Sequence, residues 1–249
     1  MKVITLIFLC FSFVFLHPDG VEPIGSGTEE DPYQIEILEN LLWVSTNSDS
    51  WDKYFFQINN IDASDTENWN GGEGFSPIGN IDIVFSGHYD GNDHTISYLT
   101  IDRPGVFNQA FLGRIMDGSV ENLNLSICNI NGSANVGILI GYSYNSMISG
   151  CSASGTVIGS VNTGGLAGIT EYSSVQECSF EGSVTGTEFV GGLIGQFFQS
   201  YITGSYTSGS VEAFNFMGGF LGLAFSSEID NCYSHCSIAG DFDVGGLVG

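Results

Sequence analysis

One short phrase recurs at a fixed interval through the C-terminal half of the chain. Its copies end in glycines at Gly141, Gly168, Gly195, Gly222 and Gly249. Each step between these glycines is 27 residues (168 − 141, 195 − 168 and so on). A fixed period of this size is typical of a solenoid, in which each repeat buries its apolar face against its neighbours. We therefore expect the 249 residues to form one elongated body.

Other positions in the repeat also keep their chemical type. The phrase itself reads Ile138-Leu139-Ile140-Gly141, Gly165-Leu166-Ala167-Gly168, Gly192-Leu193-Ile194-Gly195, Gly219-Phe220-Leu221-Gly222 and Gly246-Leu247-Val248-Gly249. Five residues after each closing glycine stand Ser146, Ser173, Ser200 and Ser227. Ten residues after it stand Cys151, Cys178, Ser205 and Cys232. Such columns are expected when the same position stacks on successive coils.

The composition favours strands over helices. Glycine supplies 35 of the 249 residues, and each one in a helix interior costs roughly 0.5–1 kcal/mol relative to alanine. As strand, 27 residues give a path of up to about 90 Å, enough for a coil of two or three short strands. We predict an all-β fold, a parallel β-helix (β-solenoid) whose coils pair about 4.8 Å apart. Crossover connections favour a right-handed coil, and glycines at the corners are expected to supply positive φ and close backbone approach.

Three regions are predicted along the chain. Residues 1–20 are expected to be a signal peptide, residues 21–112 an N-terminal cap with irregular first coils, and residues 113–249 the repeats. The cap should include a short helix over about 34–45, with Thr28 or Asp31 able to cap it. An early copy of the phrase ends at Gly113, 28 residues before Gly141, so this coil carries one extra residue. Because the sequence stops inside the phrase, we expect the natural chain to continue.

The N-terminal segment predicts export. Met1-Lys2 precedes an apolar run over 3–16, which is shorter than the ~20 residues of a membrane-spanning helix. A short membrane anchor is the alternative to a signal cleaved near 17–20.

Five cysteines remain outside the signal, an odd number without any C-x-x-C pair, so neither a disulfide framework nor a zinc site is expected. We favour a column of buried thiols over a bridge between Cys151 and Cys178. The expected location is extracellular, either secreted or on the cell surface.

The charge of the chain limits its partners. The net charge is −24 because Lys and Arg together number only 4, whereas Asp and Glu number 28. Nucleic acids and anionic membranes bind clustered Lys and Arg. Neither is therefore expected as a partner, and contact with a membrane is expected only through the signal or an anchor beyond residue 249.

The Gly-Gly-Leu-x-Gly phrase on this period resembles the GLUG motif, found in secreted and surface proteins and in accessory regions of some immunoglobulin-A-cleaving peptidases. The stretch from Gly27 to Tyr33 and the segment from Tyr89 to Ile101 also resemble the lead-in of such proteins. The resemblance covers roughly residues 25–249 and implies a parallel β-helix outside the cell. It transfers no catalytic residue, because the motif is structural.

One cluster of acids and histidines could carry chemistry. A glycosidase needs two carboxylates about 5–10 Å apart, and the densest group is His88, Asp90, Asp93 and His94. Arg103 is the only nearby base for an acidic sugar, and an Asp-Gly-Asn-Asp run is common in turns.

The segment 62–73 places oxygen ligands as in a calcium loop, but Glu67 replaces the required glycine. We therefore expect no catalytic site, no metal and no cofactor.

Tyrosines near the repeat corners are the candidate binding surface. Tyr142, Tyr144 and Tyr172 follow the closing glycines by one to four residues, so stacking should bring them to one edge. Their polar tips and apolar rings suit contact with sugars or protein side chains. The nearby Phe197, Phe198 and Phe225 are expected to seal the core. The sequence thus predicts an adhesin-like interaction module or a spacer without catalysis, binding protein or glycan. The alternatives are a polysaccharide-degrading β-helix enzyme or an accessory part of a secreted peptidase.

Overall fold

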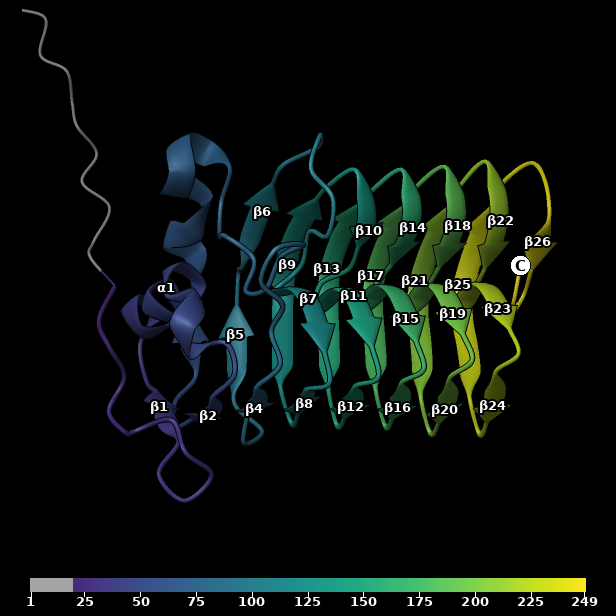
Figure 1. The fold of residues 1–249 in the computed structure, drawn as a ribbon. Helices are drawn as coiled ribbons and strands as arrows, with labels where there is room; N and C mark the ends of the chain where they lie inside the picture. Colours follow the sequence, from purple (N-terminus) through teal and green to yellow (C-terminus); the bar gives the residue numbers. More distant parts are fainter. Residues whose placement is uncertain (1–19) are drawn as a thin grey trace, which may run out of the picture.

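The computed structural model describes residues 20–249 and is a parallel β-solenoid (Figure 1). The fold class predicted from the 27-residue period is therefore confirmed. Strands of successive coils pair in parallel, so a residue lies beside the one that stands a repeat later, as Ile140 beside Ala167. The predicted signal, its cleavage region and Cys10 lie outside the described residues, apart from Gly20.

Each regular coil contains four short strands, not the expected two or three, and these build four sheets. Sheet A holds β1 (Tyr33–Ile35), β2 (Tyr54–Gln57), β4 (His88–Asp90), β8 (Ser119–Glu121), β12 (Met147–Ser149), β16 (Ser174–Gln176), β20 (Tyr201–Thr203) and β24 (Glu228–Asp230). Sheet B holds β3 (Ile61–Asp62), β5 (Thr95–Ser97), β9 (Asn124–Asn131), β13 (Ser152–Ile158), β17 (Ser179–Thr185), β21 (Tyr206–Glu212) and β25 (Tyr233–Ala239), with β6 (Thr100–Asp102) also paired to β9.

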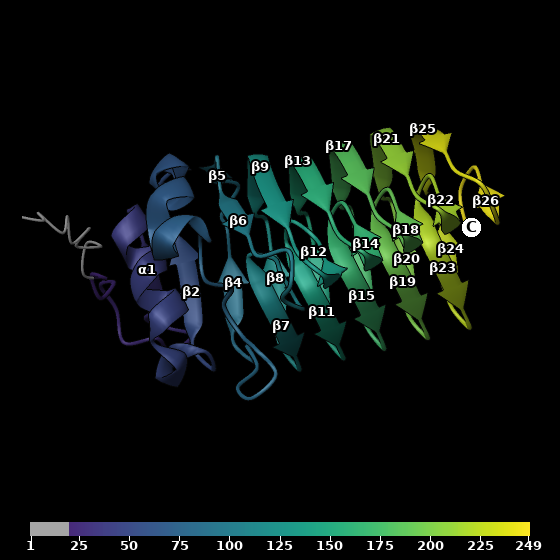
Figure 2. The ribbon, with the colours of Figure 1, turned by 90° about the horizontal axis from the view of Figure 1, so that it is seen from above.

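The other two sheets complete the coil. Sheet C holds β7 (Leu112–Met116), β11 (Ile140–Tyr144), β15 (Ala167–Glu171), β19 (Ile194–Phe198) and β23 (Leu221–Phe225). Sheet D holds β10 (Ala134–Val136), β14 (Val161–Gly164), β18 (Glu188–Gly191), β22 (Asn215–Gly218) and β26 (Val244–Gly245). Viewed from above, the coils follow one another in a single row from the N-terminal helix to the C-terminus (Figure 2).

The closing glycines act through close approach and not through positive φ. Their φ values lie outside the left-handed region, but a Cβ at Gly168 would stand 2.5 Å from the carbonyl carbon of Asn135 and 2.6 Å from the carbonyl oxygen of Gly141. The left-handed residues stand elsewhere, and they include the predicted glycines at the corner between sheets A and B, Gly150 at φ 60° and Gly204 at φ 62°. One column of them, at the corner between sheets C and A, comprises Asp117, Asn145, Tyr172, Gln199 and Ser226. Corner geometry at these positions is thus set by residues of varied type.

The serine column forms a ladder of hydrogen bonds at that corner. The backbone N–H of Ser146 donates to Oγ of Ser173 at 3.0 Å, and the N–H of Ser173 donates to Oγ of Ser200 at 3.0 Å. Each hydroxyl then donates to a carbonyl two residues earlier in its own coil; for Ser173 this is the carbonyl of Glu171, at 2.7 Å. Because the three serines are buried, the side chains satisfy backbone groups that water does not reach.

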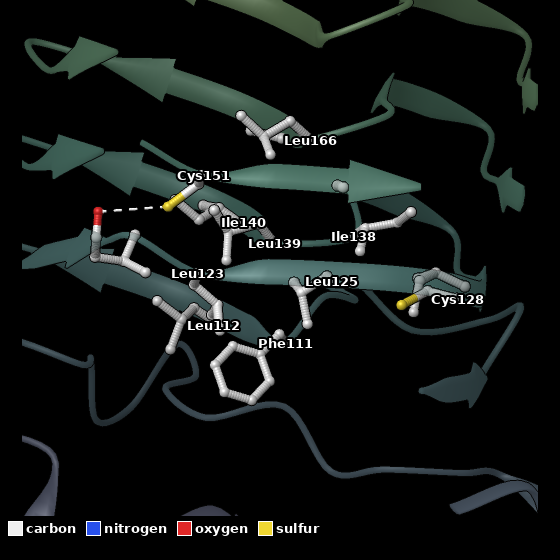
Figure 3. Close-up of a cluster of buried hydrophobic side chains, with 14 of the residues drawn as sticks. Phe111, Leu112, Leu123, Leu125, Cys128, Ile138, Leu139, Ile140, Cys151 and Leu166 are labelled. Carbon is white, nitrogen blue, oxygen red and sulfur yellow. Dashed lines mark hydrogen bonds between the residues drawn. The ribbon is translucent and has the colours of Figure 1, made fainter. Parts of the chain in front are cut away.

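The core lies inside the coil and is built by inward Leu, Ile, Val and Phe (Figure 3). Leu193 and Ile194 are both buried, although neighbouring residues of a strand face opposite sides. The reason is that Leu193 lies in the corner between β18 and β19, so only Ile194 belongs to a strand. A bend in the backbone between β18 and β19 therefore allows both neighbouring apolar residues of the repeat to face the core.

The cysteines of the described residues are free thiols. Cys151 and Cys178 are fully buried and each directs its sulfur to backbone carbonyls; Sγ of Cys151 lies 3.3 Å from the carbonyl oxygen of Ser149. Burial raises the pKa of the Cys151 thiol well above its ordinary value. Ser205 continues the column and donates to the carbonyl of Thr203 in the same way. Thiol and hydroxyl are interchangeable here because both can donate to that carbonyl.

The helix α1 (Leu38–Thr46) lies at the N-terminal end of the solenoid (Figure 1), shorter than the predicted 34–45 at its start. Neither Thr28 nor Asp31 caps it; instead Oδ1 of Asn40 accepts from the N–H groups of Glu36 and Ile37. Leu41 and Val44 pack into the core. The two 3₁₀ segments, η1 and η2, span Ser48–Ser50 and Ser64–Gly72. No helix of the described part of the chain is both long and apolar enough to cross a membrane.

The extra residue of the coil before Gly141 is a bulge in β9. Leu125 pairs with Ala153 at a spacing of 28, whereas Cys128 pairs with Gly155 at a spacing of 27. Between them Ile127 adopts φ 54° and is exposed. A bulge adds one residue to a strand without moving the next coil out of register, which is why the 27-residue period resumes at once.

Candidate binding face

An elongated groove of about 840 Å³ runs along the corner between sheets C and A. One wall is the left-handed column that includes Asn145, Tyr172 and Gln199. The other is an outward column of sheet A, whose residues pair in register: His88, Ser119, Met147, Ser174, Tyr201 and Glu228. The groove therefore crosses several coils, and its lining is mostly hydroxyl and amide groups. It also includes two phenol rings, of which that of Tyr172 is exposed and that of Tyr201 is half-buried.

The structure brings two of the three predicted tyrosines into contact. Tyr144 projects outward from β11, and its ring lies 5.3 Å from that of Tyr172, edge to face. Tyr172 stands at the corner of the next coil with 49% of its surface exposed. This pair joins the outer face of sheet C to the groove. Whether it binds a partner stays a prediction.

Tyr142 is held in a network of its own. The guanidinium of Arg114 lies 4.4 Å from the centre of its ring, and its hydroxyl donates to Oε2 of Glu171 at 2.8 Å. Partial burial and this carboxylate raise the pKa of Tyr142 to about 12. Its phenol therefore stays protonated in ordinary buffers. These contacts leave Tyr142 less free to meet a ligand than Tyr144 or Tyr172.

The expectation that three phenylalanines seal the core was right only for Phe197, which is fully buried. Phe198 is half-buried, and Phe225 is 62% exposed. Neighbouring strand residues face opposite sides, so an inward Phe197 makes Phe198 an outward residue. Phe225 pairs with Phe198 in the next coil and therefore faces outward too. These two rings extend the aromatic surface, which sequence reasoning had missed because residue type alone does not reveal the phase.

The acid and histidine cluster lies on a strand and the turn that directly follows it. His88 and Asp90 project from the outer side of β4, where Nδ1 of His88 lies 2.7 Å from Oγ of Ser119. Asp90 accepts from the backbone N–H of Asn92 and from Nδ2 of Asn122. Asp93 and His94 belong to the following turn, where Nδ1 of His94 lies 3.3 Å from Oδ1 of Asn60. Each of these side-chain contacts fixes a turn or a strand pair.

The polar segment around residues 62–74 is solvent-exposed over most of its length, and a few buried side chains anchor it to the solenoid. Trp69 is buried, and Oγ1 of Thr66 accepts from the N–H of Thr100 at 3.0 Å. Asp62 accepts from the N–H of Ser64, which lowers its pKa. Over residues 20–249 no three His, Cys, Asp or Glu side chains gather as a metal site would require.

The fold and the repeat define a parallel β-solenoid of 27-residue coils. The GLUG motif matches residues 159–185, which confirms the resemblance drawn from the repeat phrase. These residues run from the end of β13 through β14, β15 and β16 to the end of β17, so the motif is one complete coil.

Known proteins to which the chain is similar include a relative in sequence and a solved structure. Halomucin of Haloquadratum walsbyi is 42% identical over 137 residues, which are 54% of this chain and 2% of halomucin. The chain thus spans about a fiftieth of that relative. A crystal structure from Bacteroides ovatus, described as a "putative immunoglobulin A1 protease", superposes with a TM-score of 0.76 at 24% identity. The superposition covers 90% of this chain and 73% of the other chain. At this identity the similarity concerns the fold alone.

Proposed function

We propose that the chain is a non-catalytic, extracellular interaction module of adhesin type. The observation that carries this proposal is the groove along the corner of sheets C and A, with Tyr172 and Tyr201 in its lining. A groove that crosses several coils suits an extended polymer, such as a glycan or an unfolded peptide. Apolar rings with polar tips among hydroxyl groups suit weak, repeated contacts with such a chain.

The similarity to halomucin and the expected signal support a location outside the cell. The scarcity of Lys and Arg fits recognition by stacking and hydrogen bonding and not by attraction of anions. The hydrogen bonds of His88 and Asp90 to Ser119 and Asn122 give this cluster a structural role between two coils.

The binding role can be tested with matched tyrosine pairs. Tyr144→Ser combined with Tyr172→Ser removes the pair beside the groove, and Tyr206→Ser combined with Tyr233→Ser removes a stacked pair on sheet B, whose rings lie 5.2 Å apart. Binding is measured on a printed glycan array and on a mucin-coated surface, with circular dichroism as the folding control. We expect the first variant alone to lose binding. Equal binding by both variants would contradict the proposed face.

A spacer is the second candidate function. The backbone hydrogen bonds that join every coil to the next favour a stiff body that holds a neighbouring domain away from a surface. The fold shared with the Bacteroides ovatus structure makes an accessory part of a larger secreted peptidase a version of the same role. If the chain is a spacer, it should bind neither the glycan array nor the mucin-coated surface. Replacing the chain by an unrelated solenoid of equal length should then preserve the function of the whole protein.

A further inference from the structure

A crevice of about 550 Å³ lies at the N-terminal end of the solenoid, away from the groove described above. Its walls come from the end of α1 and the turn after η1, from the segment 76–81 and from the segment 103–109. Trp51 and Pro77 line it, and at its rim Ile81, Val106 and Phe107 are exposed. This volume falls within the range of small-ligand sites.

Two insertions relative to the following coil build the crevice. Ile78 pairs with Leu112, and Phe85 pairs with Ile115. The step from 78 to 85 is seven residues, whereas the step from 112 to 115 is three, so the earlier coil carries four inserted residues. In the same way, Asp102 lies beside Asn131 and Gln109 beside Val136. The step from 102 to 109 is seven residues, whereas the step from 131 to 136 is five, so a second insertion adds two residues. In repeat proteins such insertions lie on loops of one face, which is often the binding face.

The crevice contains polar groups prepared for a partner. Gln109 is 97% buried, and its Oε1 has no hydrogen-bond partner, while its Nε2 donates to the carbonyl of Phe107 at 2.7 Å. A buried acceptor without a partner is costly and calls for an explanation. Arg103 has a side chain only 16% exposed, which donates to Oγ of Ser76 and to the carbonyl of Glu73. The buried amide of Gln109 and the donor fork of Arg103 thus both belong to the lining of this small crevice.

The charges in and around the crevice favour an uncharged ligand. The guanidinium of Arg103 is already balanced by Glu73, whose Oε2 lies 3.8 Å from Nε. Among residues 20–249 no acidic side chain lines the crevice, which disfavours a cation, and the net charge of −24 disfavours an anion. Within the same residues the lining offers no strand edge to a peptide backbone, because Gln109 already pairs with Val136 and the other lining residues lie in α1 or between strands.

We infer that this crevice binds a neutral saccharide of one to three rings. Sugar hydroxyls both donate and accept, so one molecule can serve Gln109 and Arg103 together. The apolar face of a sugar ring packs on an exposed aromatic ring, and Phe107 offers one with 63% of its surface exposed. The site is separate from the tyrosine face and does not rest on the function proposed there.

The experiment compares two phenylalanines that stand in corresponding turns of different coils. Phe107→Ala removes the ring at the crevice, and Phe214→Ala removes a 54% exposed ring in the matching turn between β21 and β22. Saturation-transfer NMR and titration with neutral mono-, di- and trisaccharides measure binding to the intact chain. We expect Phe107→Ala to weaken binding by at least about tenfold, Phe214→Ala to leave it unchanged, and both to keep the melting temperature.

A second variant, Gln109→Met, replaces the buried amide by a side chain of similar length and should also weaken binding without loss of fold. The inference is overturned if no neutral saccharide binds, if only acidic sugars bind, or if the two phenylalanine variants behave alike. Loss of saccharide binding in Tyr144→Ser with Tyr172→Ser would place the sugar at the tyrosine face instead.

Discussion

Single side chains hold the corners of this solenoid by serving the backbone of the next coil. The serine hydroxyl accepts the N–H of the serine one coil earlier and donates to a carbonyl of its own coil. Cysteine and serine share a second column in which the same donation to a carbonyl recurs. Small polar residues at fixed positions in the repeat are therefore part of the hydrogen bonding of the main chain.

Ser173→Ala should lower the free energy of unfolding by about 1–3 kcal/mol, because it leaves the buried N–H of Ser146 without an acceptor. Denaturant unfolding followed by circular dichroism measures the loss. Ser174→Ala is the matched control, since this half-buried hydroxyl makes no side-chain hydrogen bond among the described residues. Equal effects of the two changes would show that the ladder adds no stability.

The sequence predicted the serine and thiol columns because their residue types repeat, and the structure gives them their contacts. It could not predict the exposure of Phe225, which depends on the phase of β23. Nor could it reveal the groove, whose left-handed wall contains Asn145, Tyr172 and Gln199, residues without a common chemistry. Likewise, the two insertions near Ile81 and Phe107 are visible only against the register of the following coils.

At the scale of the element, each strand is stabilised by its counterparts in the coils before and after it. Leu193 illustrates this arrangement: it is fully buried in a corner, and its backbone N–H donates to the carbonyl of Phe220 in the next coil. A solenoid gains its stability from such nearest-neighbour interfaces, so a weakened coil can open without the others.

Leu193→Ala should cost about 2–5 kcal/mol, as expected for a buried large-to-small change. Limited proteolysis should then cut first near this coil, and mass spectrometry of the fragments locates the site. Leu247→Ala is the control, because that leucine occupies the same position of the phrase but is exposed. If both changes leave denaturant stability untouched, corner leucines do not form the core.

At the scale of the whole molecule, negative charge accumulates on a body with few bases. Among the described residues, Lys53 pairs with Asp52, Arg103 with Glu73, and Arg114 lies over Tyr142. Parallel stacking also places acids side by side, as Asp90 beside Glu121. Like charges one strand apart repel each other.

The melting temperature should therefore rise with salt, because the Debye length falls from about 10 Å at 0.1 M to about 3 Å at 1 M. Differential scanning calorimetry in NaCl measures the rise, which should level off once screening is complete. Sucrose serves as the uncharged control, since it stabilises by exclusion alone. An unchanged melting temperature in salt would indicate that repulsion between the acids is negligible.

The stacking direction also determines how the protein responds to tension. Hydrogen bonds between coils run along the axis of the solenoid, so a pull from end to end acts on one interface after another. A coil that detaches trades about 4.8 Å of stack height for up to about 90 Å of extended chain. Under load the chain would behave as an extensible tether that dissipates work in steps while the coils that have not yet detached stay folded.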